Sequence, residues 1–245
     1  MTDLVKKEEK SFVLTSSKLV SRASPFKQRV EQAKKEEIDP STMPNRLCLM
    51  LDVSGSMSTT ESNDKSRIDL LKEAIQSFVS RCNFANTSIA LRTFPSKDEA
   101  SKLTSNGSYV VAMSLSLTAG GGTPLRQCIE ATLNEVPLTR GIVVSDGGAT
   151  DWRQDEDTVD YGEDSIKVLS EYNEQGIPID CVHISSGTDG EDLLKKIAAA
   201  TGGIFLKFTD VSAFSRGFSY LTPGYRAMLT SGDISASDIG ARELK

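Results

Sequence analysis

The fold is decided by residues 47–57, Leu-Cys-Leu-Met-Leu-Asp-Val-Ser-Gly-Ser-Met. An apolar run stops at Asp52, and Ser54 and Ser56 follow at alternate positions in a polar turn. A continuous apolar run of this kind is typical of a strand in a parallel sheet that helices cover on both faces. We therefore expect Asp52, Ser54 and Ser56 just past the carboxyl end of that strand, where open α/β sheets bind ligands. One carboxylate and two hydroxyls suit a hard divalent cation such as Mg²⁺.

Two later segments offer further oxygen ligands. Residues 120–125, Gly-Gly-Gly-Thr-Pro-Leu, form a glycine-rich loop in which Thr123 presents a hydroxyl, with Pro124 expected at the first position of a helix. Residues 141–148, Gly-Ile-Val-Val-Ser-Asp-Gly-Gly, repeat the buried-strand pattern and end it at Asp146. Because neighbouring parallel strands end at the same edge of a sheet, the sequence predicts that these side chains gather there: Asp52, Ser54, Ser56, Thr123 and Asp146.

Strand and helix patterns alternate along the rest of the chain. Helices are expected over residues 65–81, 125–136, 166–175, 191–200 and 211–221. Further strands are expected over 88–94, 109–117, 177–184 and 204–208, and the alternating apolar residues of 109–117 place that strand at the sheet edge. This order predicts one α/β domain with a doubly wound, mostly parallel sheet and helices on both faces.

With these residues the chain resembles the von Willebrand factor type A (VWA) family, whose fold is Rossmann-like. The matching motif is the metal-ion-dependent adhesion site (MIDAS): D-x-S-x-S at residues 52–56, then Thr123, then Asp146. The resemblance covers about Asn45 to Leu221. It is closest to prokaryotic or phage single-domain members, such as tellurium-resistance-associated proteins and partners of AAA+ ATPases. It implies a protein-interaction module that binds Mg²⁺ or Mn²⁺ and a partner carboxylate, without catalysis.

The chemistry of the residues leads to the same mechanism. One direct carboxylate and three hydroxyls leave much of the charge of a dication uncompensated, so an open coordination position attracts an Asp or Glu of another protein. Asp146 is expected to act through a water molecule. A metal-dependent hydrolase is a weaker alternative, because the candidate loops lack Cys and Lys and the only histidine, His183, lies in a predicted strand. A structural subunit of a virion or injection-type assembly is the other alternative.

Composition excludes several partners. A net charge of −6 and a pI near 5.0 argue against binding nucleic acid. The sequence has no apolar run of the roughly 20 residues that span a bilayer, and its first residues lack the apolar core of a signal peptide. The four cysteines occupy apolar positions without a C-x-x-C pair, which indicates free thiols and a cytoplasmic protein.

Three segments remain outside these predictions. Residues 1–44 and 222–245 are expected to be N- and C-terminal extensions that folding does not require, and their apolar residues are expected to order against another subunit. The acidic stretch from Asp151 to Asp164 is interpreted as a solvated loop, with a second cation site as the alternative. Trp152, the only tryptophan, is the candidate for an interaction hot spot in that loop.

Overall fold

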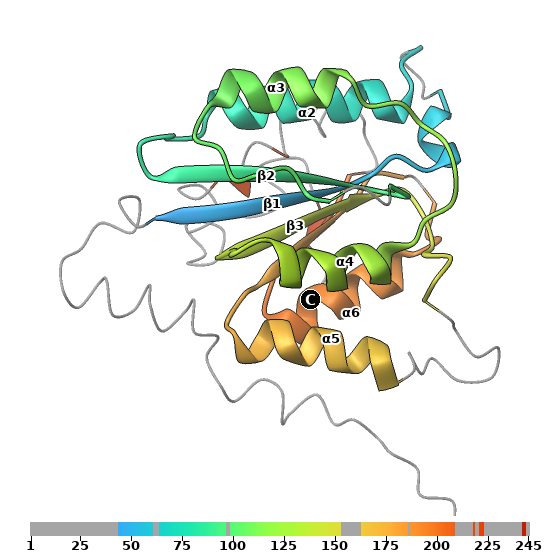
Figure 1. Cartoon of the computed structure of the whole chain (residues 1–245). Coiled ribbons are helices and arrows are strands. Elements are labelled where there is room, and N and C mark those ends of the chain that lie inside the picture. Colours follow the sequence, from blue (N-terminus) through green and yellow to red (C-terminus); the bar gives the residue numbers. More distant parts are fainter. Residues whose placement is uncertain are drawn as a thin grey trace, which may run out of the picture.

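The structure, a computed structural model, describes residues 44–60, 64–96, 99–152, 163–185, 187–208, 218, 221–222 and 242–243. Its centre is a sheet in the strand order β2-β1-β3-β4-β5-β6 (Figure 1). The strands are β1 (Asn45–Asp52), β2 (Thr87–Phe94), β3 (Arg140–Ser145), β4 (Ile179–His183), β5 (Phe205–Lys207) and β6 (Arg242–Glu243). All neighbouring pairs are parallel except β5 and β6. The predicted doubly wound, mostly parallel α/β fold is confirmed.

Helices cover both faces of this sheet (Figure 1). They are the 3-10 helix η2 (Gly55–Ser58) and the α-helices α2 (Arg67–Ser80), α3 (Gly107–Leu115), α4 (Leu125–Glu135), α5 (Glu163–Glu174) and α6 (Glu191–Thr201). One layer contains α2 and α3, and the opposite layer contains α4, α5 and α6. Among the described residues, no helix has the length and apolar character needed to cross a membrane.

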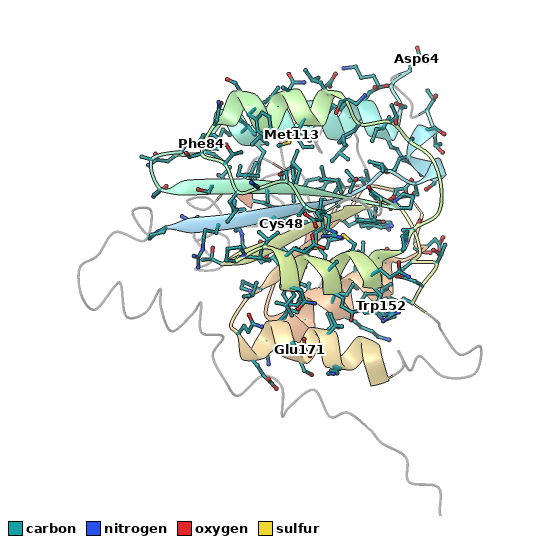
Figure 2. All side chains as sticks on the ribbon, viewed as in Figure 1. Cys48, Asp64, Phe84, Met113, Trp152 and Glu171 are labelled. Atoms are coloured by element: carbon teal, nitrogen blue, oxygen red, sulfur yellow. The ribbon has the colours of Figure 1, made fainter. Side chains whose placement is uncertain are left out.

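Strand β1 joins the two cores because its successive side chains point to opposite faces. Leu49 and Leu51 pack in the core under α2, and Cys48 and Met50 pack in the core under α4. All four are buried, so β1 is apolar on both faces, as the sequence predicted for a central strand. Figure 2 shows Cys48 in the interior of the molecule. Its thiol is free, and burial raises the pKa of Cys48 to about 12.

The prediction of an edge strand over residues 109–117 is wrong, because most of this segment belongs to the helix α3. Its apolar residues alternate, yet only Val110 and Ser114 are buried within the helix, and these are four positions apart on one helical face. Asn106 caps the helix, since its side chain accepts a hydrogen bond from the backbone N–H of Tyr109 at 3.2 Å. The helix packs on α2 and leaves Tyr109 and Leu115 exposed. The alternating apolar residues therefore lie partly on the outer side of the helix, at Tyr109 and Leu115, and partly against the core.

The extensions fall largely outside the described residues. Nothing in residues 1–43 is described, and of the helix expected over 211–221 only Phe218 and Leu221 are. Within the C-terminal extension, the structure describes Thr222 and the strand β6. Glu243 pairs with Leu206 of β5, so the extension adds an edge strand that the sequence did not predict.

Candidate metal centre

The candidate residues lie at the point where the strand order of the sheet reverses. Strand β1 pairs with β2 on one side and with β3 on the other. In the β1–β3 pair Leu51 is aligned with Val144, so Asp52 and Ser145 end their strands side by side. Loops that leave adjacent strands in opposite directions open a crevice at the carboxyl ends, which is the usual ligand position in such sheets.

Asp52 is the innermost group of the centre. It is fully buried; its Oδ1 accepts a hydrogen bond from the Ser54 backbone N–H at 2.8 Å, and its Oδ2 accepts one from Ser145 Oγ at 2.5 Å. Burial raises the pKa of Asp52 to about 6, and the hydrogen bonds from Ser145 and Ser54 oppose that rise. A nearby cation favours the ionised form of such a buried carboxyl group. Ser145 is a site residue that sequence reasoning missed.

A directed chain of hydrogen bonds connects three of the predicted residues. Ser56 Oγ donates to Asp146 Oδ1 at 2.9 Å, so its single proton is committed to that carboxylate. The contact between Ser54 Oγ and Ser56 Oγ, also 2.9 Å, therefore has Ser54 as the donor. Ser54 occupies one lone pair of Ser56 Oγ, and the second remains free to accept. This arrangement keeps a serine oxygen available to a cation.

Asp146 is held at both of its oxygens. Its Oδ2 accepts a hydrogen bond from Arg67 Nη1 at 2.6 Å, while Oδ1 accepts from Ser56. The Asp146 side chain is 1% exposed and that of Arg67 is 15% exposed, so solvent screens this ion pair little. Arg67 begins α2, which was predicted as a helix, but its contact with a residue 79 positions away leaves no trace in the sequence.

The glycine-rich loop packs directly on the D-x-S-x-S turn. The backbone N–H of Gly55 donates to Gly121 O at 2.9 Å, and the backbone N–H of Gly120 donates to Val53 O at 2.7 Å. Gly121 has φ +84°, and a Cβ there would lie 2.5 Å from Pro95 Cγ, so only glycine fits. These contacts fix the loop that carries the remaining predicted ligand.

Thr123 is placed by its backbone and by a neighbouring threonine. Its N–H donates to Thr150 Oγ1 at 3.2 Å, and its carbonyl oxygen accepts from the N–H groups of Leu125 and Thr150. Thr123 as a whole is 7% exposed, and its hydroxyl makes no hydrogen bond with any described residue. A hydroxyl without a hydrogen bond is available to a metal. Pro124 immediately precedes α4 instead of beginning it.

The donor set fits a hard cation. Within the part of the chain that the structure describes, no three His, Cys, Asp or Glu side chains gather as a metal-binding group. The donors at this centre are instead hydroxyl and carboxylate oxygens, which Mg²⁺ and Mn²⁺ prefer over nitrogen or sulfur. The structure brings Asp52, Ser54, Ser56 and Asp146 into one hydrogen-bonded group and holds the Thr123 loop against it.

One prediction about the acidic stretch is wrong, and most of the stretch lies outside the described residues. Trp152 is 4% exposed and belongs to the core beneath α4 and α6, so it is not a surface hot spot (Figure 2). Asp151 begins the acidic stretch but caps α4, because its carboxylate accepts the backbone N–H groups of Arg126 and Gln127 at 3.1 and 2.9 Å. Residues 153–162, where a second cation would bind, lie outside the described residues.

His183 is packed, as predicted. It is fully buried at the end of β4, and its Nε2 lies 3.0 Å from the carbonyl oxygen of Asp189. Burial lowers the pKa of His183, so the ring is neutral near pH 7. A neutral ring with Nε2 facing a carbonyl oxygen carries its proton on Nε2. It has a structural hydrogen bond and no place in the candidate metal centre.

Comparison with known proteins identifies the fold. No protein-family model and no curated protein matches the sequence. Among solved structures, the vWF domain of the type V pili tip protein Mfa5 from Porphyromonas gingivalis is similar with a TM-score of 0.55 at 14% identity, covering 79% of this chain and 97% of that chain. The SpRpn10 VWA domain is similar with a TM-score of 0.56 at 12% identity, covering 71% and 95%. The chain has the VWA fold.

A third structure with this fold contains a metal. It is proximal thread matrix protein 1 from the mussel byssus with a zinc occupied MIDAS motif, and its TM-score is 0.56 at 16% identity. The match covers 80% of this chain and 51% of that one. The predicted likeness to prokaryotic single-domain members stays a prediction.

Proposed function

We propose that this VWA domain binds a protein partner through a Mg²⁺ or Mn²⁺ ion at its MIDAS. Ser54, Ser56 and Thr123 would ligate the ion directly, Asp52 would ligate it or anchor its shell, and Asp146 would act through water. The observation that carries the proposal is the Thr123 hydroxyl, which makes no hydrogen bond with any described residue. The glycine-rich loop holds it beside the hydrogen-bonded chain from Ser54 through Ser56 to Asp146.

The ion would supply one open coordination position for a carboxylate of the partner. The residues of the chain do the positioning: Ser56 directs its proton to Asp146, Ser145 and the Ser54 N–H hold Asp52, and the glycine loop brings Thr123 close. The edge that presents this position is formed by residues 54–60, 119–123 and 146–151. We expect the partner to be a protein with an exposed Asp or Glu, such as an AAA+ ATPase or an assembly subunit.

Calorimetric titration with Mg²⁺ tests the metal site. Thr123→Val keeps the shape of the side chain and removes one oxygen, so we expect Mg²⁺ affinity to fall at least about tenfold, the effect of losing roughly 1.4 kcal/mol. The melting temperature in EDTA should stay unchanged, because no described hydrogen bond is lost. Thr118→Val, at an exposed position of the same connection, is the matched control and should bind like the parent. A parent protein that binds neither Mg²⁺ nor Mn²⁺ contradicts the proposal.

A pulldown with Mg²⁺ and again with EDTA separates this function from the structural-subunit alternative. A metal-bridged partner is lost in EDTA and also lost with Thr123→Val. A partner retained equally under both conditions would support a subunit held by surface contacts instead.

A further inference from the structure

A guanidinium group is built into the candidate metal centre. Arg67 Nη1 lies 2.6 Å from Asp146 Oδ2, and both side chains are largely shielded from solvent. The start of α2 fixes the arginine: its backbone N–H donates to Thr59 O at 3.0 Å, and Ser66 caps the helix by accepting from the N–H of Asp69. Arg67 is therefore a positioned cation, and not a long side chain that happens to lie near the site.

This pairing restricts what Asp146 can offer to a metal. Ser56 occupies Oδ1 and Arg67 occupies Oδ2, so neither oxygen is free of a hydrogen bond. The negative charge of Asp146 is already paired with the guanidinium of Arg67. Arg67 therefore makes the net charge of the centre one unit more positive, both when the centre is empty and when a dication is bound.

We infer that Arg67 shifts the preference of the centre from the metal toward the partner carboxylate, an inference that rests on the function proposed above. Its charge repels the dication and so weakens binding of the metal alone. The same charge makes the loaded site more positive, and this strengthens its attraction for an acidic side chain of the partner. The bound dication also attracts the carboxylate, so each of the two binds better in the presence of the other.

The experiment measures the dissociation constant of Mn²⁺ by electron paramagnetic resonance of the free ion. Each protein is titrated in chloride and again in acetate at the same ionic strength, with acetate as the carboxylate probe. At a fixed acetate concentration, the gain in Mn²⁺ affinity grows with the affinity of the Mn²⁺-loaded centre for acetate, so it reports that affinity. The proteins are the parent, Arg67→Met, Arg67→Gln, Arg67→Lys and the control Lys72→Met.

Arg67→Met and Arg67→Gln should bind Mn²⁺ in chloride about tenfold more tightly than the parent, because a repelling charge is gone. Acetate should raise the Mn²⁺ affinity of the parent and raise that of these variants less. Arg67→Lys keeps the charge and should behave like the parent in both respects. Lys72→Met removes one positive charge from an ion pair with Asp69 elsewhere on α2, so it reports the effect of net charge alone.

Equal or weaker Mn²⁺ binding by both uncharged variants, with melting temperatures in EDTA near that of the parent, would overturn the inference. If one of the two does not fold, the other decides, and Arg67→Lys shows whether charge or shape matters. Failure of the proposed function looks different, since the parent itself would then bind no Mn²⁺.

Discussion

At the scale of single residues, the candidate metal centre depends on backbone contacts that tolerate no extra atom. Gly190 precedes α6 with φ +71°, and a Cβ there would lie 2.3 Å from the carbonyl oxygen of Gly147. Gly147 directly follows Asp146. For Gly190→Ala we expect the free energy of unfolding to fall by about 2–4 kcal/mol, from left-handed strain together with overpacking. Urea denaturation measures this loss.

The control for that substitution is Gly120→Ala, in the glycine-rich loop of the same centre. A Cβ on Gly120 meets no atom within 4 Å, and its φ is not in the left-handed region. We expect little or no change in stability there. If Gly190→Ala were as stable as Gly120→Ala, the close contact between the two loops would not exist in solution.

The five predicted ligands could be found from local sequence patterns, whereas the two missed residues depend on contacts between distant parts of the chain. The D-x-S-x-S turn is local, and its position after a buried strand follows from the apolar run before it. Ser145 and Arg67 act through contacts across 93 and 79 positions of sequence. The sequence predicts that Arg67 lies in a helix, but the rotation and tilt of that helix, set by packing, decide that its guanidinium reaches Asp146.

At the scale of elements, the sequence predicted the type of each buried helix and strand and failed for α3. A buried amphipathic helix repeats its apolar residues at three- and four-residue spacing, and α2, α4 and α6 do so. In α3 the apolar residues extend to the solvent side, with Tyr109 53% and Leu115 54% exposed. When apolar residues lie on both sides of a helix, the three- and four-residue spacing of the buried side is no longer visible in the sequence. The remaining alternation of apolar and polar residues led to the prediction of a strand. The prediction that Trp152 is exposed failed because its neighbours in sequence are polar, although its own side chain is buried.

Helix α4 illustrates how one loop residue stabilises an element. Asp151 accepts hydrogen bonds from the backbone N–H groups of both Arg126 and Gln127, which lack partners inside the helix. For Asp151→Ala we expect the free energy of unfolding to fall by about 1–2 kcal/mol. Mg²⁺ affinity should change little, since Asp151 is not among the proposed ligands. Thermal and urea denaturation in EDTA measure the loss.

Asp192→Ala is the matched control for the cap. Asp192 lies in the first turn of α6 with its side chain 79% exposed, so it interacts with the helix dipole without a capping bond. Its removal should cost less than about 0.5 kcal/mol. Similar losses for the two aspartates would mean that charge near a helix start, and not the pair of hydrogen bonds, stabilises α4.

At the scale of the whole molecule, strand order determines where the chemistry can occur. The alternation of strands and helices predicted parallel pairing. Strands β1 and β3 are neighbours at the point where the strand order reverses, so Asp52 at the end of β1 lies near Asp146, which follows β3. The sequence could not predict β6. Arg242 and Glu243 are two residues without any apolar pattern, and they pair with Lys207 and Leu206, which lie more than 30 positions earlier in the sequence.

This edge strand yields a prediction about the C-terminal extension. A chain that ends at residue 239 lacks β6, which leaves the outer backbone groups of β5 without their antiparallel partner. We expect the amide of Lys207, which points away from β4, to exchange with solvent faster, while the amides of β1 and β3 keep their protection. Mg²⁺ affinity should stay that of the parent, because β4 and β5 separate β6 from the candidate metal centre in the sheet.

The double variant Arg242→Ala with Glu243→Ala is the control, because it keeps the backbone and should preserve exchange protection in β5. Unchanged exchange after truncation would show that β6 does not pair in solution, and loss of Mg²⁺ binding would show that the extension supports the metal centre.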